Sequence, residues 1–179
     1  LRSGVGLLTV HVPKTGWQIM QTSAPEAMAS IDQHEKCWSE FVELENFDAV
    51  GIGPGLGTEK ETIKALGKML DSTTKPLVID ADGLNILAMH PEFLHMLPEN
   101  SILTPHMKEF ERLVGSWSNS FERLEKQQAF SQTTKSILVV KGAYSSITTP
   151  EGQVYFNSTG NPGMATGGSG DVLTGILTG

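Results

Sequence analysis

Short apolar runs alternate with longer amphipathic stretches along most of the chain. Each apolar run is rich in leucine and β-branched residues, which is typical of strands buried on both faces of a parallel sheet. The runs that predict strands are residues 7–12, 49–52, 77–79, 101–103 and 137–140. Because amphipathic segments separate these strands, we predict an α/β fold with a mainly parallel sheet and helices on both of its faces.

Signals for helix starts, breaks and turns refine this pattern. Thr58 and Glu61 have the spacing of a capping box, and they predict a helix from Thr58 to about Leu70. Pro25 interrupts the pattern, so we expect residues 16–30 to be mostly irregular. The other expected elements are the end of a helix over 1–6, helices over 33–44, 91–97, 106–114 and 118–134, a hairpin of 146–149 with 153–157, and a final helix from Asp171.

Length, charge and cysteine content limit the possible partners. The net charge of −7 gives no electrostatic reason to bind nucleic acid or an anionic membrane. Cys37 is the single cysteine, so an internal disulfide is impossible, and we expect a reducing, cytoplasmic location. The 179 residues predict one domain, 1–179. The chain starts at Leu1 and stops within the predicted final helix, so we expect a fragment that lacks N-terminal strands and C-terminal helices; a homo-oligomer is compatible with the sequence.

Residues 160–175 read GNPGMATGGSGDVLTG and join a glycine-rich loop to the final helix. The first N–H groups of a helix have no partners within it and carry a partial positive charge, so they attract anions. We therefore predict that Gly168, Ser169 and Gly170 form an anion hole for a phosphoryl group, with the carboxylate of Asp171 beside it. The alternative is that Asp171 only starts a helix, where aspartate is common.

Two further segments follow predicted strands, where open α/β folds bind their ligands. Residues 53–57 read GPGLG, which is neither a Walker loop nor the GxGxxG fingerprint of dinucleotide oxidoreductases. This segment is either a ligand-binding loop or only a tight turn. Residues 80–85 read DADGLN, and Asp80 and Asp82 are suited to holding magnesium-bound waters, to orienting a hydroxyl or to capping a helix.

The next two strands are followed by a histidine and a lysine. His106 and Glu109 share one face of a predicted helix start, although a lone histidine is more often structural than catalytic. Lys141 stands at a strand end and can reach a phosphate as a point charge, although a lysine on the rim of a sheet is also common. Because all these residues follow strands of one parallel sheet, we predict that they meet at one edge of it.

The segments GPGLG, DADGLN, TPHMKE, KGAYSS and GMATGGSGDVLTG together resemble the ADP- or ATP-dependent NAD(P)H-hydrate dehydratases of the ribokinase-like superfamily. The resemblance covers nearly the whole chain. It implies a ribokinase-like three-layer fold, incomplete at both ends, with ADP or ATP as phosphoryl donor and Mg²⁺ as cofactor. It implies that Asp171 is the catalytic base and contacts the substrate.

The resemblance also implies binding roles, although it assigns no metal ligand. The implied contacts are substrate binding by Gly55, Gly57 and His106, nucleotide binding by Lys141, Gly142, Ala143, Tyr144, Ser145 and Gly170, and places near the site for Asp82, Asn85 and Glu109. Tyr144 departs from the small or polar residues of the family, and its ring is expected to pack on the base or sugar.

The implied reaction is the repair of hydrated NADH or NADPH. Phosphorylation of the substrate hydroxyl converts a poor leaving group into phosphate, whose elimination restores the reduced nicotinamide. One alternative is a ribokinase-like kinase that phosphorylates a sugar or small alcohol and stops there. Another is an inactive nucleotide-binding fragment.

Overall fold

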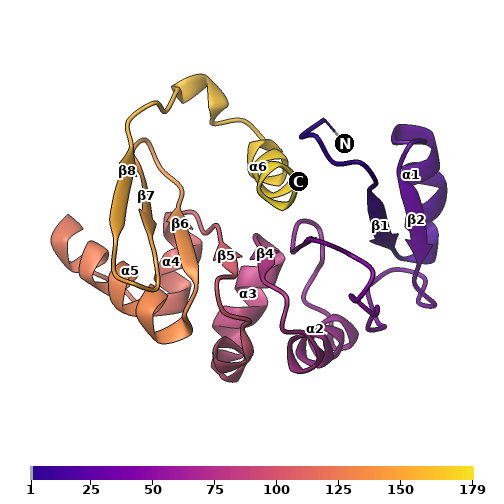
Figure 1. Cartoon of the computed structure of the whole chain (residues 1–179), viewed down its shortest axis with the longest axis horizontal. Coiled ribbons are helices and arrows are strands. Elements are labelled where there is room, and N and C mark those ends of the chain that lie inside the picture. Colours follow the sequence, from indigo (N-terminus) through magenta and orange to yellow (C-terminus); the bar gives the residue numbers. More distant parts are fainter. Residues whose placement is uncertain (1) are drawn as a thin grey trace.

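A six-stranded sheet organises most of the molecule (Figure 1). The structure is a computed structural model that describes residues 2–179. The strands follow one another across the sheet in sequence order, and the first four are parallel whereas the last two form an antiparallel hairpin. They are β3 (Val50–Ile52), β4 (Leu77–Ile79), β5 (Ile102–Leu103), β6 (Ile137–Val140), β7 (Ser145–Thr148) and β8 (Val154–Asn157).

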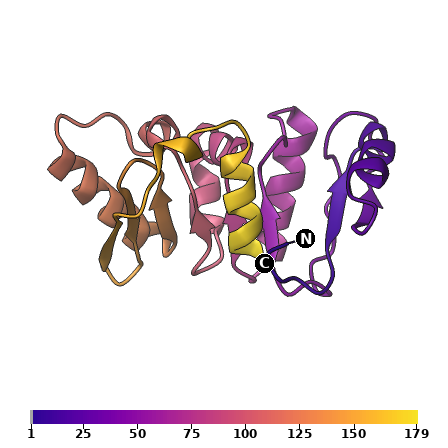
Figure 2. The same ribbon diagram turned by 90° about the horizontal axis from the view of Figure 1, so that it is seen from above.

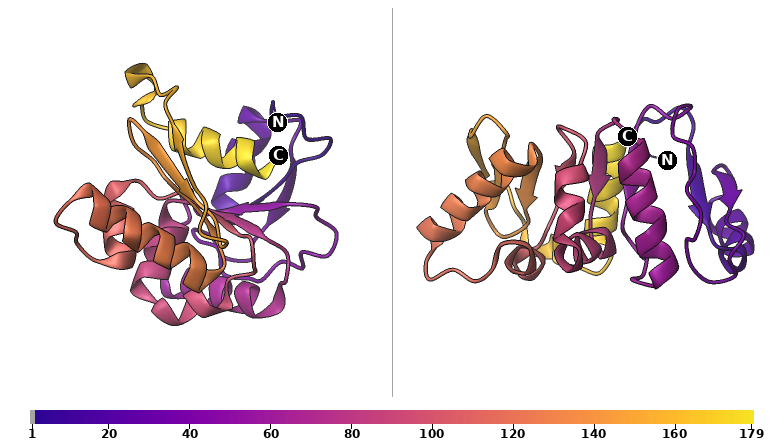
Figure 3. Two further views of the ribbon diagram at one scale, coloured as in Figure 1. Left: turned by 60° about the vertical axis from the view of Figure 1, so that its left-hand side comes forward. Right: turned by 90° about the horizontal axis from the view of Figure 1, so that it is seen from below.

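Helices cover both faces of this sheet, in unequal number. Four helices pack on one face, and they are α2 (Lys60–Ser72), α3 (Asp82–Met89), α4 (Met107–Val114) and α5 (Ser120–Thr134). A short 3-10 helix, η2 (Pro91–Met96), follows α3. The final helix, α6 (Ser169–Thr178), lies alone on the opposite face, against β3 and β4 (Figures 1 and 3). The expected mainly parallel sheet with helices on both faces is confirmed.

The N-terminal part forms a separate two-stranded sheet at one end of the molecule (Figure 2). Its strands, β1 (Thr9–Val12) and β2 (Met28–Ile31), are parallel. They are joined by η1 (Lys14–Gly16) and α1 (Trp17–Ser23). Ser3 lies beside α6, and its hydroxyl is 3.5 Å from Gly175 O (Figure 1). No helix within residues 2–179 is long and apolar enough to cross a membrane.

The core lies between the sheet and its four-helix layer. Leu66 and Phe110 are fully buried from the helix side, as are Ile79, Leu103 and Leu138 from the strands. These strand residues belong to the short apolar runs of the sequence, so the runs correctly predicted the central strands of the sheet. The core holds the strand ends rigidly and thereby positions the loops that follow them.

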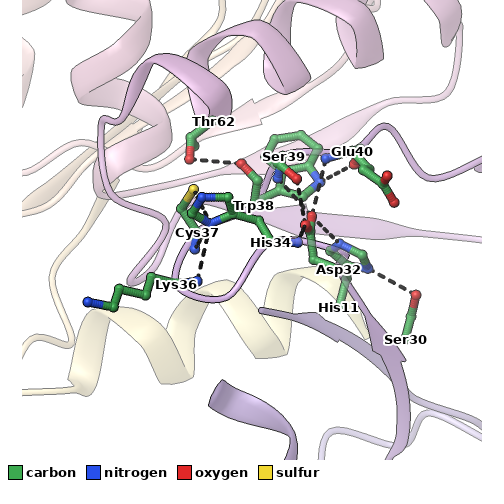
Figure 4. Close-up of polar contacts among 10 residues, drawn as sticks. All are labelled: His11, Ser30, Asp32, His34, Lys36, Cys37, Trp38, Ser39, Glu40 and Thr62. Atoms are coloured by element: carbon green, nitrogen blue, oxygen red, sulfur yellow. Dashed lines mark hydrogen bonds and ion pairs between the residues drawn. The ribbon is translucent and has the colours of Figure 1, made fainter. Parts of the chain in front are cut away.

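The helix expected over residues 33–44 is wrong, and the reason is the carboxylate of Asp32 (Figure 4). It accepts hydrogen bonds from the main-chain N–H groups of His34, Ser39 and Glu40, at 2.7, 2.7 and 3.2 Å. The Ser39 hydroxyl and the His11 ring add bonds of 2.6 and 3.1 Å. Peptide groups that bond to a side chain in this way are withdrawn from a helix.

The same contacts set the charge state of Asp32, which is buried. Burial raises the pKa of this carboxyl, but the hydrogen bonds from Ser39, His34 and His11 outweigh it, and the pKa lies well below its usual range. Asp32 is therefore a charged anchor that ties the loop after β2 to β1.

Three smaller expectations also fail. Residues 16–30 are not mostly irregular, because Pro25 ends α1 rather than preventing it, and β2 follows. Thr58 is not the helix cap, since α2 begins after Glu59 and no side chain caps it. Residues 2–6 are not helical, and Leu1 lies outside the described residues.

Candidate functional site

The carboxyl ends of the four parallel strands bring the predicted site residues to one edge of the sheet. Asp80 directly follows β4, and its main-chain N–H bonds to Ile52 O of β3 at 3.0 Å. His106 and Lys141 follow β5 and β6 and form an isolated parallel bridge. The loop of residues 53–57 follows β3, so all four loops lie side by side as the topology requires.

The head of α6 offers free donors at this edge. Gly168 adopts the left-handed conformation, with φ 86°, and no side chain caps the helix. Among the described residues, the main-chain N–H groups of Gly170 and Asp171 have no hydrogen-bond partner. The Asp171 side chain is exposed. The two free amides at the positive end of the helix suit the binding of an anion, and the exposed carboxylate next to them can accept a proton.

Lys141 is held next to these amides by a buried acid. Its Nζ donates to Asp80 Oδ1 at 2.7 Å, and the Asp80 side chain is only 2% exposed. A Cβ atom added to Gly170 would lie 3.5 Å from Lys141 Nζ and 3.6 Å from Asp80 Oδ2. A positive charge therefore stands beside the first turn of α6, where a phosphate could meet both.

A chain of polar contacts links the glycine turn after β3 to the helix after β4. Gly57 N donates to Asp82 Oδ2 at 2.9 Å, and Asn85 Nδ2 donates to Asp82 Oδ1 at 3.2 Å. Arg112 donates in turn to Asn85 Oδ1 at 2.8 Å. Asp82 is the first residue of α3 and not its cap. Its contact with Gly57 ties Asp82 to the loop of residues 53–57, and Asn85 is tied to that loop through Asp82.

His106 caps α4, and this fixes how its ring is presented. Its Nδ1 accepts from the N–H groups of Lys108 and Glu109 at 3.1 and 3.3 Å, while Glu109 Oε2 accepts from His106 N at 2.8 Å. The Nδ1 lone pair is thereby occupied, so a neutral ring carries its proton on Nε2. The side chain is 49% exposed. Nε2 also faces Glu109 Oε1, at 3.4 Å, so a ligand at this edge that accepts from Nε2 competes with that carboxylate.

The predicted nucleotide segment forms the turn between β6 and β7. Gly142 N donates to Ser145 Oγ at 3.3 Å, and the Tyr144 side chain is 70% exposed. The glycine-rich loop passes close by, since a Cβ atom on Gly160 would lie 2.7 Å from Ala143 O. The Tyr144 ring is accessible to a ligand, and its packing on the base or sugar stays a prediction.

Close backbone packing explains the first glycine of the turn. A Cβ atom on Gly53, where φ is 128°, would lie 1.8 Å from Asp80 O, so no side chain fits there. Gly55, in contrast, has no atom within 4 Å of its Cβ position. Gly53 thus has a packing reason within the fold, whereas Gly55 has a conformational one, because its φ of 66° lies in the left-handed region that favours glycine.

The contacts of two residues at this edge were not predicted. The predicted roles of Asp80 are holding magnesium-bound waters, orienting a hydroxyl or capping a helix, and Thr174 gives no signal in the sequence. Thr174 Oγ1 donates to Asp80 Oδ2 at 2.9 Å. The two residues are 94 positions apart, and no local pattern links them.

The described residues offer no ready-made metal site. No group of three or more histidine, cysteine or acidic side chains within residues 2–179 is arranged to hold a metal ion. Both Asp80 oxygens are already occupied by donors. Mg²⁺ commonly binds through one or two carboxylates together with substrate phosphates, so these residues fit a metal that arrives with a nucleotide.

Two hollows lie away from this edge. One of about 320 Å³ lies between η2, α4 and α5 and has a mainly apolar lining that includes Leu94, Leu113 and Phe130. The other, of about 360 Å³, is lined by Arg2, Ser23, Ala24 and Glu26. Neither is lined by a predicted site residue.

Comparison with known proteins decides the family. The family model described as NAD(P)H-hydrate dehydratase matches residues 1–179. The chain belongs to this family. The resemblance to the NAD(P)H-hydrate dehydratases is thereby confirmed. The ribokinase-like fold is confirmed by a ribokinase-like superfamily protein from Enterococcus faecalis, with a TM-score of 0.77 and 27% identity over 98% of this chain and 61% of that chain.

Individual relatives support the assignment. The bifunctional NAD(P)H-hydrate repair enzyme of Moorella thermoacetica is 38% identical over 189 residues, which cover 100% of this chain and 36% of that protein. A solved structure of the ADP/ATP-dependent NAD(P)H-hydrate dehydratase from Bacillus subtilis matches with a TM-score of 0.80 and 30% identity. That protein was co-crystallised with ATP/Mg²⁺ and soaked with CoA. That match covers 99% of this chain and 64% of the Bacillus chain. The chain thus spans about a third of the curated relative's length.

The fold is shared more widely than the family. Hydroxyethylthiazole kinase from Pyrococcus horikoshii has a TM-score of 0.64 at 19% identity, covering 96% of this chain and 70% of that chain. At that identity the likeness concerns the fold alone. Function must therefore be argued from the site and from the family.

Proposed function

We propose that this chain carries out nucleotide-dependent dehydration of the hydrates of NADH and NADPH. The observation that carries the proposal is the head of α6, where two free amides, the exposed Asp171 carboxylate and Lys141 stand together. Family membership and the relatives' names supply the substrate class. The Bacillus relative, co-crystallised with ATP/Mg²⁺, supports a nucleotide as the phosphoryl donor.

The reaction proceeds in two steps. Asp171 accepts the proton of the hydrate hydroxyl as the hydroxyl oxygen attacks the terminal phosphoryl group of ADP or ATP. This attack releases AMP or ADP. The C–O bond then breaks as the ring nitrogen supplies electrons, a ring proton is lost, and free phosphate and reduced nicotinamide are formed. Phosphoryl transfer depends mainly on positioning and charge stabilisation. The Gly170 and Asp171 amides supply that stabilisation at the migrating group.

The remaining residues position the two ligands. Lys141 neutralises nucleotide phosphate, and Gly142, Ala143, Tyr144 and Ser145 border the nucleotide. Gly168 completes the anion hole at the head of α6. The main-chain N–H and the hydroxyl of Ser169 both donate to Thr166 O, at 3.3 and 2.9 Å, so Ser169 borders the anion hole without a free donor.

On the substrate side, Gly55 and Gly57 contact the hydrate, and His106 donates to it from Nε2. Glu109 fixes the orientation of His106, and Asp82 and Asn85 support the glycine turn. Mg²⁺, carried on the nucleotide phosphates, supplies additional charge neutralisation when bound. We also infer a cytoplasmic location and allow for a homo-oligomer, and both stay predictions.

The test follows recovery of reduced nicotinamide absorbance and release of phosphate from hydrated NADH, with ADP and with ATP. We expect both signals with the unchanged chain. Asp171→Asn should abolish turnover and leave nucleotide affinity unchanged, because the free amides and Lys141 remain. Asp71→Asn, a change at an exposed acid near the end of α2, is the matched control and should retain full activity.

Two results would contradict the proposal. Unchanged rates in Asp171→Asn would remove the assigned base. Accumulation of a stable phosphorylated alcohol, without recovery of the nicotinamide, would instead identify a kinase on the same fold.

A further inference from the structure

We propose that Asp80 is a positioning residue, which holds Lys141 and the first turn of α6 in the arrangement that receives phosphate. This inference rests on the proposed function of the same site. Asp80 is 1% exposed and stands at the carboxyl end of β4. Its role follows from the way in which its two oxygens are shared among three parts of the chain.

Each oxygen of the Asp80 carboxylate has its own partners. Oδ1 accepts from Lys141 Nζ at 2.7 Å and from Ala81 N at 2.8 Å. Oδ2 accepts from Thr174 Oγ1 at 2.9 Å. The carboxylate thus joins the ends of β4 and β6 to α6, the helix on the sheet face opposite α2 to α5. Because both oxygens are satisfied by donors, Asp80 is not arranged as a metal ligand.

The partners of Asp80 lie next to the proposed anion hole. Thr174 Oγ1 lies 2.9 Å from Asp80 Oδ2 and 3.2 Å from Gly170 O, and its single proton serves one of these two acceptors at a time; the shorter contact, to Asp80, ties the acid to α6 one turn after Gly170. The Cβ position of Gly170 is within 3.6 Å of both Lys141 Nζ and Asp80 Oδ2. A lysine ammonium has three donors, and Asp80 takes one of them, which leaves two for a phosphate.

Stability alone is a weaker explanation for this arrangement. Removing a carboxylate from water is unfavourable, and well-packed apolar side chains often stabilise a core as well as a buried ion pair does. Lysine has a flexible stem and needs a fixed partner to hold its charge at one point. The backbone adds a second observation, because Ala81 adopts φ 49° and ψ −119°, a strained conformation for a residue with a side chain. The Ala81 N–H is held by Asp80 itself.

The experiment uses the full chain labelled with ¹⁵N and inorganic phosphate as the probe, followed through the amide signals of Gly170 and Asp171. Asp80→Asn should weaken phosphate binding about tenfold or more, the effect of losing a hydrogen bond to a charged group. The ammonium signal of Lys141 should also broaden, because its fixed partner is gone. Glu99→Gln, which removes the partner of exposed Lys135, is the matched control and should leave both signals unchanged.

A second pair of variants keeps the test decisive if Asp80→Asn does not fold. Thr174→Val has nearly the same shape but lacks the hydroxyl, whereas Thr174→Ser retains it. We expect Thr174→Val to weaken phosphate binding several-fold and Thr174→Ser to restore it. A role in packing alone predicts little effect on phosphate from either variant, so wild-type phosphate affinity in folded Asp80→Asn or Thr174→Val overturns the inference.

Failure of the inference is distinguishable from failure of the proposed function. If the variants weaken phosphate binding but hydrated NADH is never repaired, the positioning role of Asp80 stands and the proposed function falls. If repair proceeds equally well in wild type and Asp80→Asn, with equal phosphate affinity, the function stands and the positioning role is overturned.

Discussion

Gly170→Ala separates the binding role of the first turn of α6 from its contribution to stability. Gly170 has no strained backbone conformation, and an added Cβ would lie at ordinary contact distances, 3.5 Å from Lys141 Nζ and 3.6 Å from Asp80 Oδ2. The variant should therefore fold. Replacing glycine by alanine within a helix stabilises it by up to about 1 kcal/mol, so the free energy of unfolding should stay equal or rise.

Phosphate binding should respond in the opposite direction. The new methyl group occupies the space between the Gly170 amide and the Lys141 ammonium, where the anion is proposed to lie. Loss of one hydrogen bond to a charged group corresponds to about 1.5–3 kcal/mol, or roughly 10- to 150-fold weaker binding. Gly175→Ala is the matched control, because Gly175 lies in the same helix and has no atom within 4 Å of its Cβ position.

Calorimetric titration with ATP and Mg²⁺, alongside chemical denaturation, measures both quantities. We expect Gly175→Ala to bind like the unchanged chain and Gly170→Ala to bind much more weakly, with neither variant less stable. Equal ATP affinity in the two variants would refute the placement of the phosphoryl group at Gly170.

Two further predictions concern the N-terminal part and the start of β4. Asp32→Asn should lower the free energy of unfolding by about 2–3 kcal/mol at neutral pH, since buried N–H donors lose a charged acceptor. The folded-state pKa of Asp32 is lowered, so its stabilisation is present above about pH 4 and is lost as pH falls toward the folded-state value. Denaturation curves should therefore converge in acid, and a constant difference would contradict this account. Lys75→Met should destabilise the fold by about 1–3 kcal/mol, because Lys75 Nζ donates to the carbonyls of Leu44, Glu45 and Phe47. Hydrogen exchange of the variant that stays slow over residues 44–47 would show that these bonds contribute little.

Local pattern was sufficient where one short apolar run made one strand. Residues 77–79 and 137–140 were predicted with the bounds that the structure has, and β3, β5 and the hairpin differ by a residue or so at their ends. Buried strands between polar loops leave few alternatives. The parallel order of these strands then placed the four loops at one edge of the sheet.

Features that depend on distant contacts could not be read from the sequence. The segment over residues 33–44 has helical composition, yet Asp32 withdraws its peptide groups from a helix. The N-terminal strands form their own sheet, although their pattern resembles that of the others. Lys141 was expected to face a nucleotide, but its pairing with Asp80 across 61 residues had no local signal.

Titration of the ¹⁵N-labelled chain with ATP and Mg²⁺ tests the central claim most directly. If the head of α6 holds the phosphoryl group, the amide signals of Gly170 and Asp171 should shift most, together with those of Ala143, Tyr144 and Ser145. Shifts that leave Gly170 and Asp171 unmoved and gather instead around Leu94, Leu113 and Phe130 would contradict it.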